Sequence, residues 1–155
     1  MHKAVKLLSS IGLCLAIGAL GSIFTSSSVN NWYESILKPS FNPPNWLFGP
    51  VWTILFILMG ITLYLLLIAK KSKNRTLTLK LFYAQLGFNL LWSIFFFGWK
   101  NPLLALIDLI ILWIFILFTL LKTFKVSRRG GYLLIPYLVW VSFAFVLNLS
   151  IVLLN

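Results

Sequence analysis

The chain has 155 residues, of which 61% are hydrophobic and only 10% are charged, and its mean hydropathy is +0.99. A water-soluble domain of this length cannot bury so much apolar surface, so the composition excludes a soluble enzyme and predicts an integral membrane protein. The formal net charge is +11. No base-reading motif accompanies this charge, so we expect no nucleic-acid partner.

Five segments are apolar over the roughly 20 residues that a helix needs to cross the hydrocarbon core. Strand-type alternation is absent from the sequence, which argues against a β-barrel. The sequence therefore predicts a single all-α transmembrane domain, a five-helix bundle. The expected helices span residues 5–26, 47–69, 81–99, 103–123 and 131–154.

The basic residues divide unequally between the two ends of these helices. With five spans, the N-terminus and the second and fourth loops share one side of the membrane, and only Lys38 and Lys100 fall on the other. Because basic loops stay in the cytoplasm, we expect a cytoplasmic N-terminus and an outside C-terminus, in a bacterial cytoplasmic membrane. The basic residues on the first side are Lys3, Lys6, Lys70, Lys71, Lys73, Arg75, Lys80, Lys122, Lys125, Arg128 and Arg129.

The first predicted helix carries small residues four positions apart, Gly12 with Ala16 and Gly18 with Ser22. This spacing lets two helices approach closely. We favour packing within the bundle, and a homodimer through this helix stays open as the alternative. The lone cysteine, Cys14, lies in the same helix and is expected to be a small buried hydrophobe.

The connection after the first helix is long and aromatic. The segment from Trp32 to Trp52 holds three tryptophans and four prolines. Proline restricts φ and removes a backbone donor, so this segment should be partly ordered. It is too apolar for a solvated connector, and we expect it to form a lid over the outer mouth of the bundle. Asn45 is expected to cap the second helix.

Polar or aromatic side chains recur along one face of each of the last four helices. Polar groups in hydrocarbon normally face protein or a cavity, so each stripe indicates a surface that is turned inward. A rise of about 1.5 Å per residue places most of these groups in the outer half of the bundle. A cavity there would suit a flat, largely apolar ligand. The stripes are Trp52, Phe56 and Met59; Gln85, Asn89 and Trp92; Asp108, Leu112 and Phe115; and Trp140, Ala144 and Asn148.

Several of these residues also have a structural interpretation. Asn89 and Asn148 can hydrogen-bond neighbouring helices, and Trp46 fits an anchor at the membrane interface. Asp108 is the only carboxylate in the spans and suits a structural acceptor, a ligand contact or a proton site. The sequence has one histidine, His2, and no cluster of His and Cys, so we expect no metal site and no required cofactor.

A set of short motifs runs in order through residues 32–148. They are Trp32-Tyr33, Lys38-Pro39-Ser40, Pro43-Pro44, Pro50-Val51-Trp52, Met59-Gly60, Gln85-Leu86, Asn89, Trp92-Ser93, Phe96-Phe97-Gly98, Asp108, Pro136-Tyr137, Trp140, Ala144 and Leu147-Asn148. Each motif is weak alone, but the set is specific. With these motifs the chain resembles the tryptophan-rich sensory protein/translocator protein family, also called the peripheral benzodiazepine receptor family, in its bacterial form.

The resemblance implies a five-helix bundle whose ligand pocket is closed by the first loop. It also implies binding of tetrapyrroles or other lipophilic small molecules within the membrane lipid. We therefore expect a membrane receptor or sensor that takes protoporphyrin IX or a haem-like porphyrin as its ligand. The implied pocket comprises Trp32, Trp46, Trp52, Asn89, Trp92, Asp108, Trp140, Ala144 and Asn148.

Two other functions stay open. Light-dependent porphyrin degradation would use Trp32 and Trp140, which occupy the positions that the resemblance associates with this chemistry. Transport of a porphyrin or another lipophile would depend on Asp108, although the sequence shows no inverted repeat. The chain departs from the family at Phe41 and Phe56, which replace a usual tryptophan and tyrosine. It also lacks the C-terminal sterol-recognition pattern, so cholesterol binding is not implied.

Overall fold

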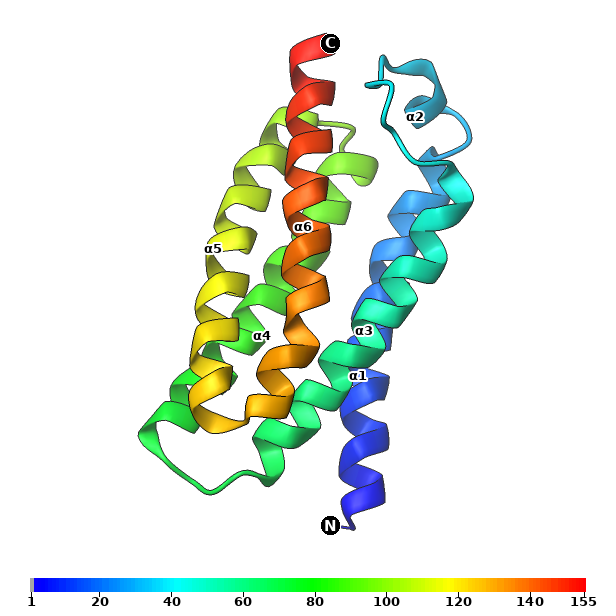
Figure 1. Cartoon of the computed structure of the whole chain (residues 1–155). Coiled ribbons are helices and arrows are strands. Elements are labelled where there is room, and N and C mark those ends of the chain that lie inside the picture. Colours follow the sequence, from blue (N-terminus) through cyan, green and yellow to red (C-terminus); the bar gives the residue numbers. More distant parts are fainter. Residues whose placement is uncertain (1) are drawn as a thin grey trace.

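The computed structural model describes residues 2–155, and helices make up most of them (Figure 1). Five helices are long and apolar enough to cross a membrane, and residues 2–155 contain no strand, so the predicted all-α five-helix bundle is confirmed. The short helix α2 (Trp32–Ser35) lies in the first loop, and a π-helical turn, η1 (Ile94–Gly98), extends α4. The long helices are α1 (Lys3–Ser28), α3 (Asn45–Ile68), α4 (Lys73–Ser93), α5 (Pro102–Val126) and α6 (Arg128–Leu154).

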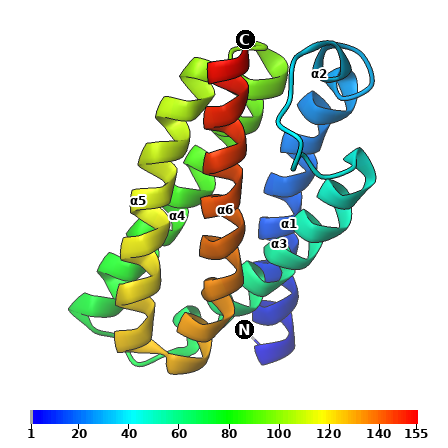
Figure 2. The ribbon, with the colours of Figure 1, turned by 45° about the horizontal axis from the view of Figure 1, so that its top comes forward.

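The long helices run up and down between two ends of different chemistry. The N-terminus and the α3–α4 and α5–α6 connections lie at one end, which we call the basic end (Figure 1). Residues 29–44, which we call the lid, and the C-terminus lie at the other, the lid end. Around the bundle, the order of neighbours is α1, α3, α6, α5, α4 and back to α1. Toward the lid end, where α2 and the C-terminus lie (Figures 1 and 2), α1 packs against η1, and α3 packs against α6.

Local sequence explains where the helices begin. The side chain of Ser72 accepts a hydrogen bond from the main-chain N–H of Arg75 at 3.1 Å, which satisfies a free donor in the first turn of α4. This helix therefore begins at Lys73 rather than at residue 81, because its first two turns are helical without being apolar. The expectation for Asn45 was wrong: it is the first residue of α3, after Pro44, and its side chain makes no capping hydrogen bond.

Two glycines allow α1 and α3 to pack closely. A Cβ atom added to Gly60 of α3 would overlap the Cα atom of Ile11 in α1. Nearer the lid end, a Cβ atom on Gly18 would lie 2.6 Å from the ring of Phe56. Gly12, by contrast, has no atom of residues 2–155 within 4 Å of its Cβ position. Of the two small-residue pairs in α1, the one at Gly18 thus packs within the bundle and the one at Gly12 faces outward.

The contact at Gly60 makes a testable prediction about stability. Gly60→Ala should lower the free energy of unfolding by about 1–3 kcal/mol, because the new methyl group meets backbone that cannot rotate away. Thermal unfolding of the purified protein in nanodiscs would measure the effect. Gly12→Ala is the matched control, since the same methyl group enters open space. Equal unfolding temperatures for the two variants would contradict this account of the α1–α3 contact.

Candidate ligand-binding site

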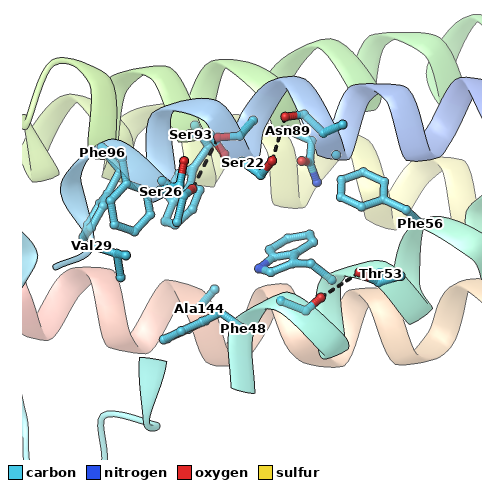
Figure 3. A pocket seen from close by; sticks show the side chains of 18 of the residues that line it. Ser22, Ser26, Val29, Phe48, Thr53, Phe56, Asn89, Ser93, Phe96 and Ala144 are labelled. Carbon is cyan, nitrogen blue, oxygen red and sulfur yellow. Dashed lines mark hydrogen bonds between the residues drawn. The ribbon is translucent and has the colours of Figure 1, made fainter. Parts of the chain in front are cut away.

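A cavity of about 520 Å³ lies between α1 and α4 on one side and α3 and α6 on the other, on the lid side of the Gly60 contact (Figure 3). This volume is in the range of small-molecule pockets. Residues of α1, α3, α4, η1 and α6 line it, together with Tyr33 of the lid. Figure 3 shows Phe48 and Phe56 of α3 and Phe96 of η1 around the cavity, so its walls are largely aromatic.

The structure brings together five of the nine residues that the sequence predicted for the pocket. Trp52 comes from α3, Asn89 and Trp92 from α4, and Ala144 and Asn148 from α6, and all five line the cavity. Two of them meet across the bundle, since the indole Nε1 of Trp92 donates to the Asn148 Oδ1 at 3.0 Å.

Two of the predicted residues lie away from the cavity wall. Trp46 is 72% exposed at the beginning of α3, where an indole suits the membrane interface. Asp108 is 4% exposed on α5, a helix that contributes no residue to the lining within the described chain. Among residues 2–155, its Oδ2 is the one buried side-chain polar atom without a hydrogen-bond partner.

Trp32 and Trp140 are each separated from the cavity by one phenylalanine ring. The ring centroid of Trp32 lies 5.6 Å from that of Phe96, and the centroid of Trp140 lies 6.2 Å from that of Phe48. Phe96 and Phe48 line the cavity, whereas the two tryptophans do not. Trp140 belongs to the same stripe as Asn148, but eight residues of helix turn the stripe by about 80°. One end of that stripe therefore faces the cavity and the other faces α3.

Sequence reasoning missed the contribution of α1. Gly18, Ser22 and Ser26 line the cavity from this helix, and Figure 3 shows both serines at its edge. The spacing of Gly18 and Ser22 was interpreted only as a packing signal, although with Ser26 these residues, each four apart, also mark a small and polar helix face. Phe48, Thr53, Ser93 and Phe96 were likewise not predicted as lining residues.

Besides the amide of Asn45 at the start of α3, three polar groups on the cavity wall have no hydrogen-bond partner within residues 2–155. They are the indole Nε1 of Trp52, the amide Oδ1 of Asn89 and the hydroxyl Oγ of Ser93. The indole can only donate, the amide oxygen can only accept, and the hydroxyl can do either. A polar group at the wall of an apolar cavity is stabilised when a ligand or a water molecule completes its hydrogen bonds. The wall can therefore orient a ligand that has polar edges.

A buried chain of hydrogen bonds sets the direction of the Asn89 amide. Asn89 Nδ2 donates to the hydroxyl of Tyr137 at 2.7 Å, and that hydroxyl donates to Gln85 Oε1 at 2.8 Å. Gln85 Nε2 in turn contacts the sulfur of Met59 at 3.8 Å. The amide nitrogen of Asn89 is thus bonded inside the protein, and the Asn89 oxygen is left as the acceptor at the cavity.

The π-helical turn Ile94–Gly98 presents two phenylalanines to the lid. A π turn adds a residue to the helical repeat and so rotates the side chains that follow it. Phe96 stacks on Trp92, with ring centroids 5.0 Å apart and an angle of 20° between the rings. Tyr33, which is 2% exposed, packs its ring 6.0 Å from that of Phe96 and 5.6 Å from that of Phe97. The lid is therefore docked on the same aromatic cluster that forms one cavity wall.

Hydrogen bonds within the lid hold its shape. The hydroxyl of Tyr33 donates to Asn42 Oδ1 at 2.7 Å, and burial raises the pKa of this hydroxyl to about 12, so it stays a donor at neutral pH. Lys38 Nζ donates to the carbonyl oxygens of Tyr33 at 2.6 Å and Ile36 at 3.1 Å. The same ammonium lies 4.9 Å from the centroid of the Tyr33 ring, a cation–π contact.

Removal of the Lys38 ammonium should loosen the lid. Lys38→Met keeps the aliphatic stem but leaves the two carbonyls without their charged donor. A loss of about 1.4 kcal/mol would speed local opening roughly tenfold. Hydrogen–deuterium exchange at residues 32–38 would measure the change. Lys100→Met is the control, because Lys100 is the other basic residue at the lid end. Exchange that is equally slow in both variants would show that Lys38 does not hold the lid.

Comparison with known proteins places this geometry in a family. Residues 10–154 match the TspO/MBR family. The chain is 49% identical to the tryptophan-rich protein TspO of Chlorobaculum tepidum, over 100% of the chain and 99% of that protein. It is 32% identical to the tryptophan-rich sensory protein of Cereibacter sphaeroides, over 96% and 90% of the two chains. It is 35% identical to the translocator protein of Bos taurus, over 92% and 82%.

Proposed function

Because the chain belongs to the TspO/MBR family and is an integral membrane protein, we propose that it is a membrane sensor whose cavity binds porphyrins and similar flat, lipophilic ligands. The observation that carries this proposal is the cavity of about 520 Å³, with aromatic walls and a few polar groups that lack partners. The names of two relatives, a sensory protein and a translocator protein, support a sensing or translocating role at the membrane.

The ligand would be held between aromatic faces and a few polar contacts. Trp52 and Phe56 lie side by side on α3, with ring centroids 5.7 Å apart and an angle of 32° between the rings. Together they offer an aromatic surface on which a macrocycle can stack. A porphyrin has N–H donors in its ring and carboxylate acceptors at its edge. The first suits the Asn89 oxygen, and the second suits the Trp52 N–H and the Ser93 hydroxyl.

The protein would face the cytoplasm with its basic end. Lys and Arg residues crowd the connections at that end, whereas Lys38 and Lys100 lie at the other. Positively charged loops are retained in the cytoplasm, which supports a cytoplasmic N-terminus in the cytoplasmic membrane. In this orientation the cavity lies in the outer half of the membrane and the lid covers its outer end.

Titration of the protein with protoporphyrin IX would test the binding site. Saturable quenching of tryptophan fluorescence is expected in the wild type. Ala144→Phe should abolish binding because the new ring fills the cavity. Trp52→Phe should weaken it about threefold to tenfold, because a hydrogen bond and part of the stacking surface are lost.

Trp46→Phe is the matched control, since the same substitution is made at an exposed indole outside the cavity. Its affinity should equal that of the wild type. If Trp52→Phe and Ala144→Phe also bind with wild-type affinity, the proposed site is wrong.

If the protein binds porphyrin without degrading it, light-induced bleaching of the porphyrin should not depend on Trp32 and Trp140. Trp32 and Trp140 lie behind Phe96 and Phe48, out of contact with a ligand in the cavity. The Trp32→Phe/Trp140→Phe variant should therefore bleach illuminated protoporphyrin IX at the wild-type rate, as followed by absorbance. Slower bleaching with different products would favour the degradative enzyme instead.

Transport has its own test. Asp108 lies outside the cavity wall, so Asp108→Asn should leave the affinity for protoporphyrin IX unchanged. Uptake into proteoliposomes that depends on an ion gradient, and that Asp108→Asn abolishes, would favour a transporter over a sensor.

A further inference from the structure

The exposed residues of the cavity lining lie on one side of the cavity. Five of its lining residues are exposed, and all five lie along the seam between α1 and α3. The opposite wall is closed, since its residues Asn89, Phe96 and Leu147 are buried. We call the exposed edge the side opening. Its residues are Ala19, Ser22 and Ser26 of α1 and Gly49 and Thr53 of α3.

Residue size explains why this seam is open. Toward the basic end, Gly60 brings the backbones of α1 and α3 together, and Gly18 of α1 receives the ring of Phe56. Along the side opening, no side chain is larger than threonine, so nothing fills the space between the helices there. Figure 3 shows Ser22 and Ser26 on α1, across the cavity from Thr53 on α3.

The side opening faces lipid rather than water. It belongs to two helices that are long and apolar enough to span the membrane. Ser22 lies six residues before the end of α1 and Thr53 eight residues after the start of α3. At about 1.5 Å per residue, these positions are about 9 and 12 Å from the helix ends, within the apolar layer.

The hydroxyl groups at the side opening are compatible with lipid. Ser22 Oγ donates to the carbonyl oxygen of Ala19 at 2.7 Å, and Thr53 Oγ1 donates to that of Gly49 at 2.8 Å. Because each hydroxyl proton is bonded to its own helix, neither leaves an unpaired donor in hydrocarbon. Their oxygen lone pairs remain free to accept from an N–H or O–H group of a molecule that passes between the helices.

The route through the lid, by contrast, is held shut. The main-chain N–H of Leu37 donates to Asn155 Oδ1 at 3.0 Å, and Asn155 Nδ2 donates back to the Leu37 carbonyl oxygen at 2.9 Å. This reciprocal pair ties the lid to the end of α6. The contacts of Tyr33 and Lys38 add to it on the other side of the lid.

We propose that the cavity loads from the membrane, sideways between α1 and α3, with ligands that are dissolved in the bilayer and carry N–H or O–H donors. The lid then covers the cavity without opening, and the ligand does not pass through it. This inference rests on the proposed function, because it requires that the cavity hold a lipophilic ligand.

Two reversible cross-links would separate the two routes. Both are placed in a Cys14→Ala background, which removes the one native thiol. Ser22→Cys with Thr53→Cys spans the side opening, and Leu37→Cys with Asn155→Cys ties down the lid. A membrane-permeable bifunctional thiosulfonate closes each pair, and a reducing agent reopens it. Stopped-flow quenching with protoporphyrin IX in nanodiscs measures the association and dissociation rate constants.

Relative to the same cysteine variant before cross-linking, the cross-link at the side opening should lower both rate constants by about tenfold or more and in the same proportion, since a blocked path slows entry and exit equally. Reduction should restore the rates of the same cysteine variant before cross-linking, which shows that the cross-linked protein is folded. The cross-link at the lid should change neither rate. Unchanged rates with the side opening closed, or slowing only with the lid closed, would overturn this inference. Absence of saturable quenching in the wild type would instead overturn the proposed function.

Discussion

The cavity depends on the contact between Gly60 of α3 and the backbone of Ile11 in α1. Two helices that touch this closely at one point are farther apart elsewhere. The space between them is then filled only where side chains are large enough. Toward the basic end the gap is filled by a core that includes Met59, Leu63 and Leu66. Toward the lid end, from Gly18 to Ser26, α1 turns only residues no larger than threonine to the cavity, so the space stays open. A single close approach thus determines both the tight half of the bundle and the hollow half.

The polar groups of the bundle serve two different purposes. Tyr137 and Gln85 are fully enclosed and satisfy each other, so they connect α4 to α6 without reaching the cavity. Asn89 lies at the boundary, with its amide nitrogen in this chain of hydrogen bonds and its oxygen at the cavity. Because the interior part fixes the amide, a ligand would meet an acceptor that is already oriented. Such preorganisation reduces the free-energy cost of binding.

The cavity wall and the lid contact the same aromatic residues. Phe96 stacks on Trp92 and also packs against Tyr33 of the lid. A ligand that displaces Phe96 would therefore disturb the docking of the lid at the same time. This shared cluster gives the site a physical connection to the surface of the protein at the lid end, which a sensor requires if occupancy is to be detected by another molecule.

The sequence by itself determined the number of spans and the inward-facing positions Trp52, Asn89 and Asn148, because hydropathy and helical periodicity are local properties. Only the tertiary structure decided which neighbour each face meets. It placed Asp108 and Trp140 outside the cavity and brought in Ser22, whose spacing indicates a small or polar helix face but not what that face meets. Helix packing and the π-helical turn depend on contacts between residues far apart in the chain. No pattern within one helix encodes these contacts, so the lining of the cavity was only partly predictable.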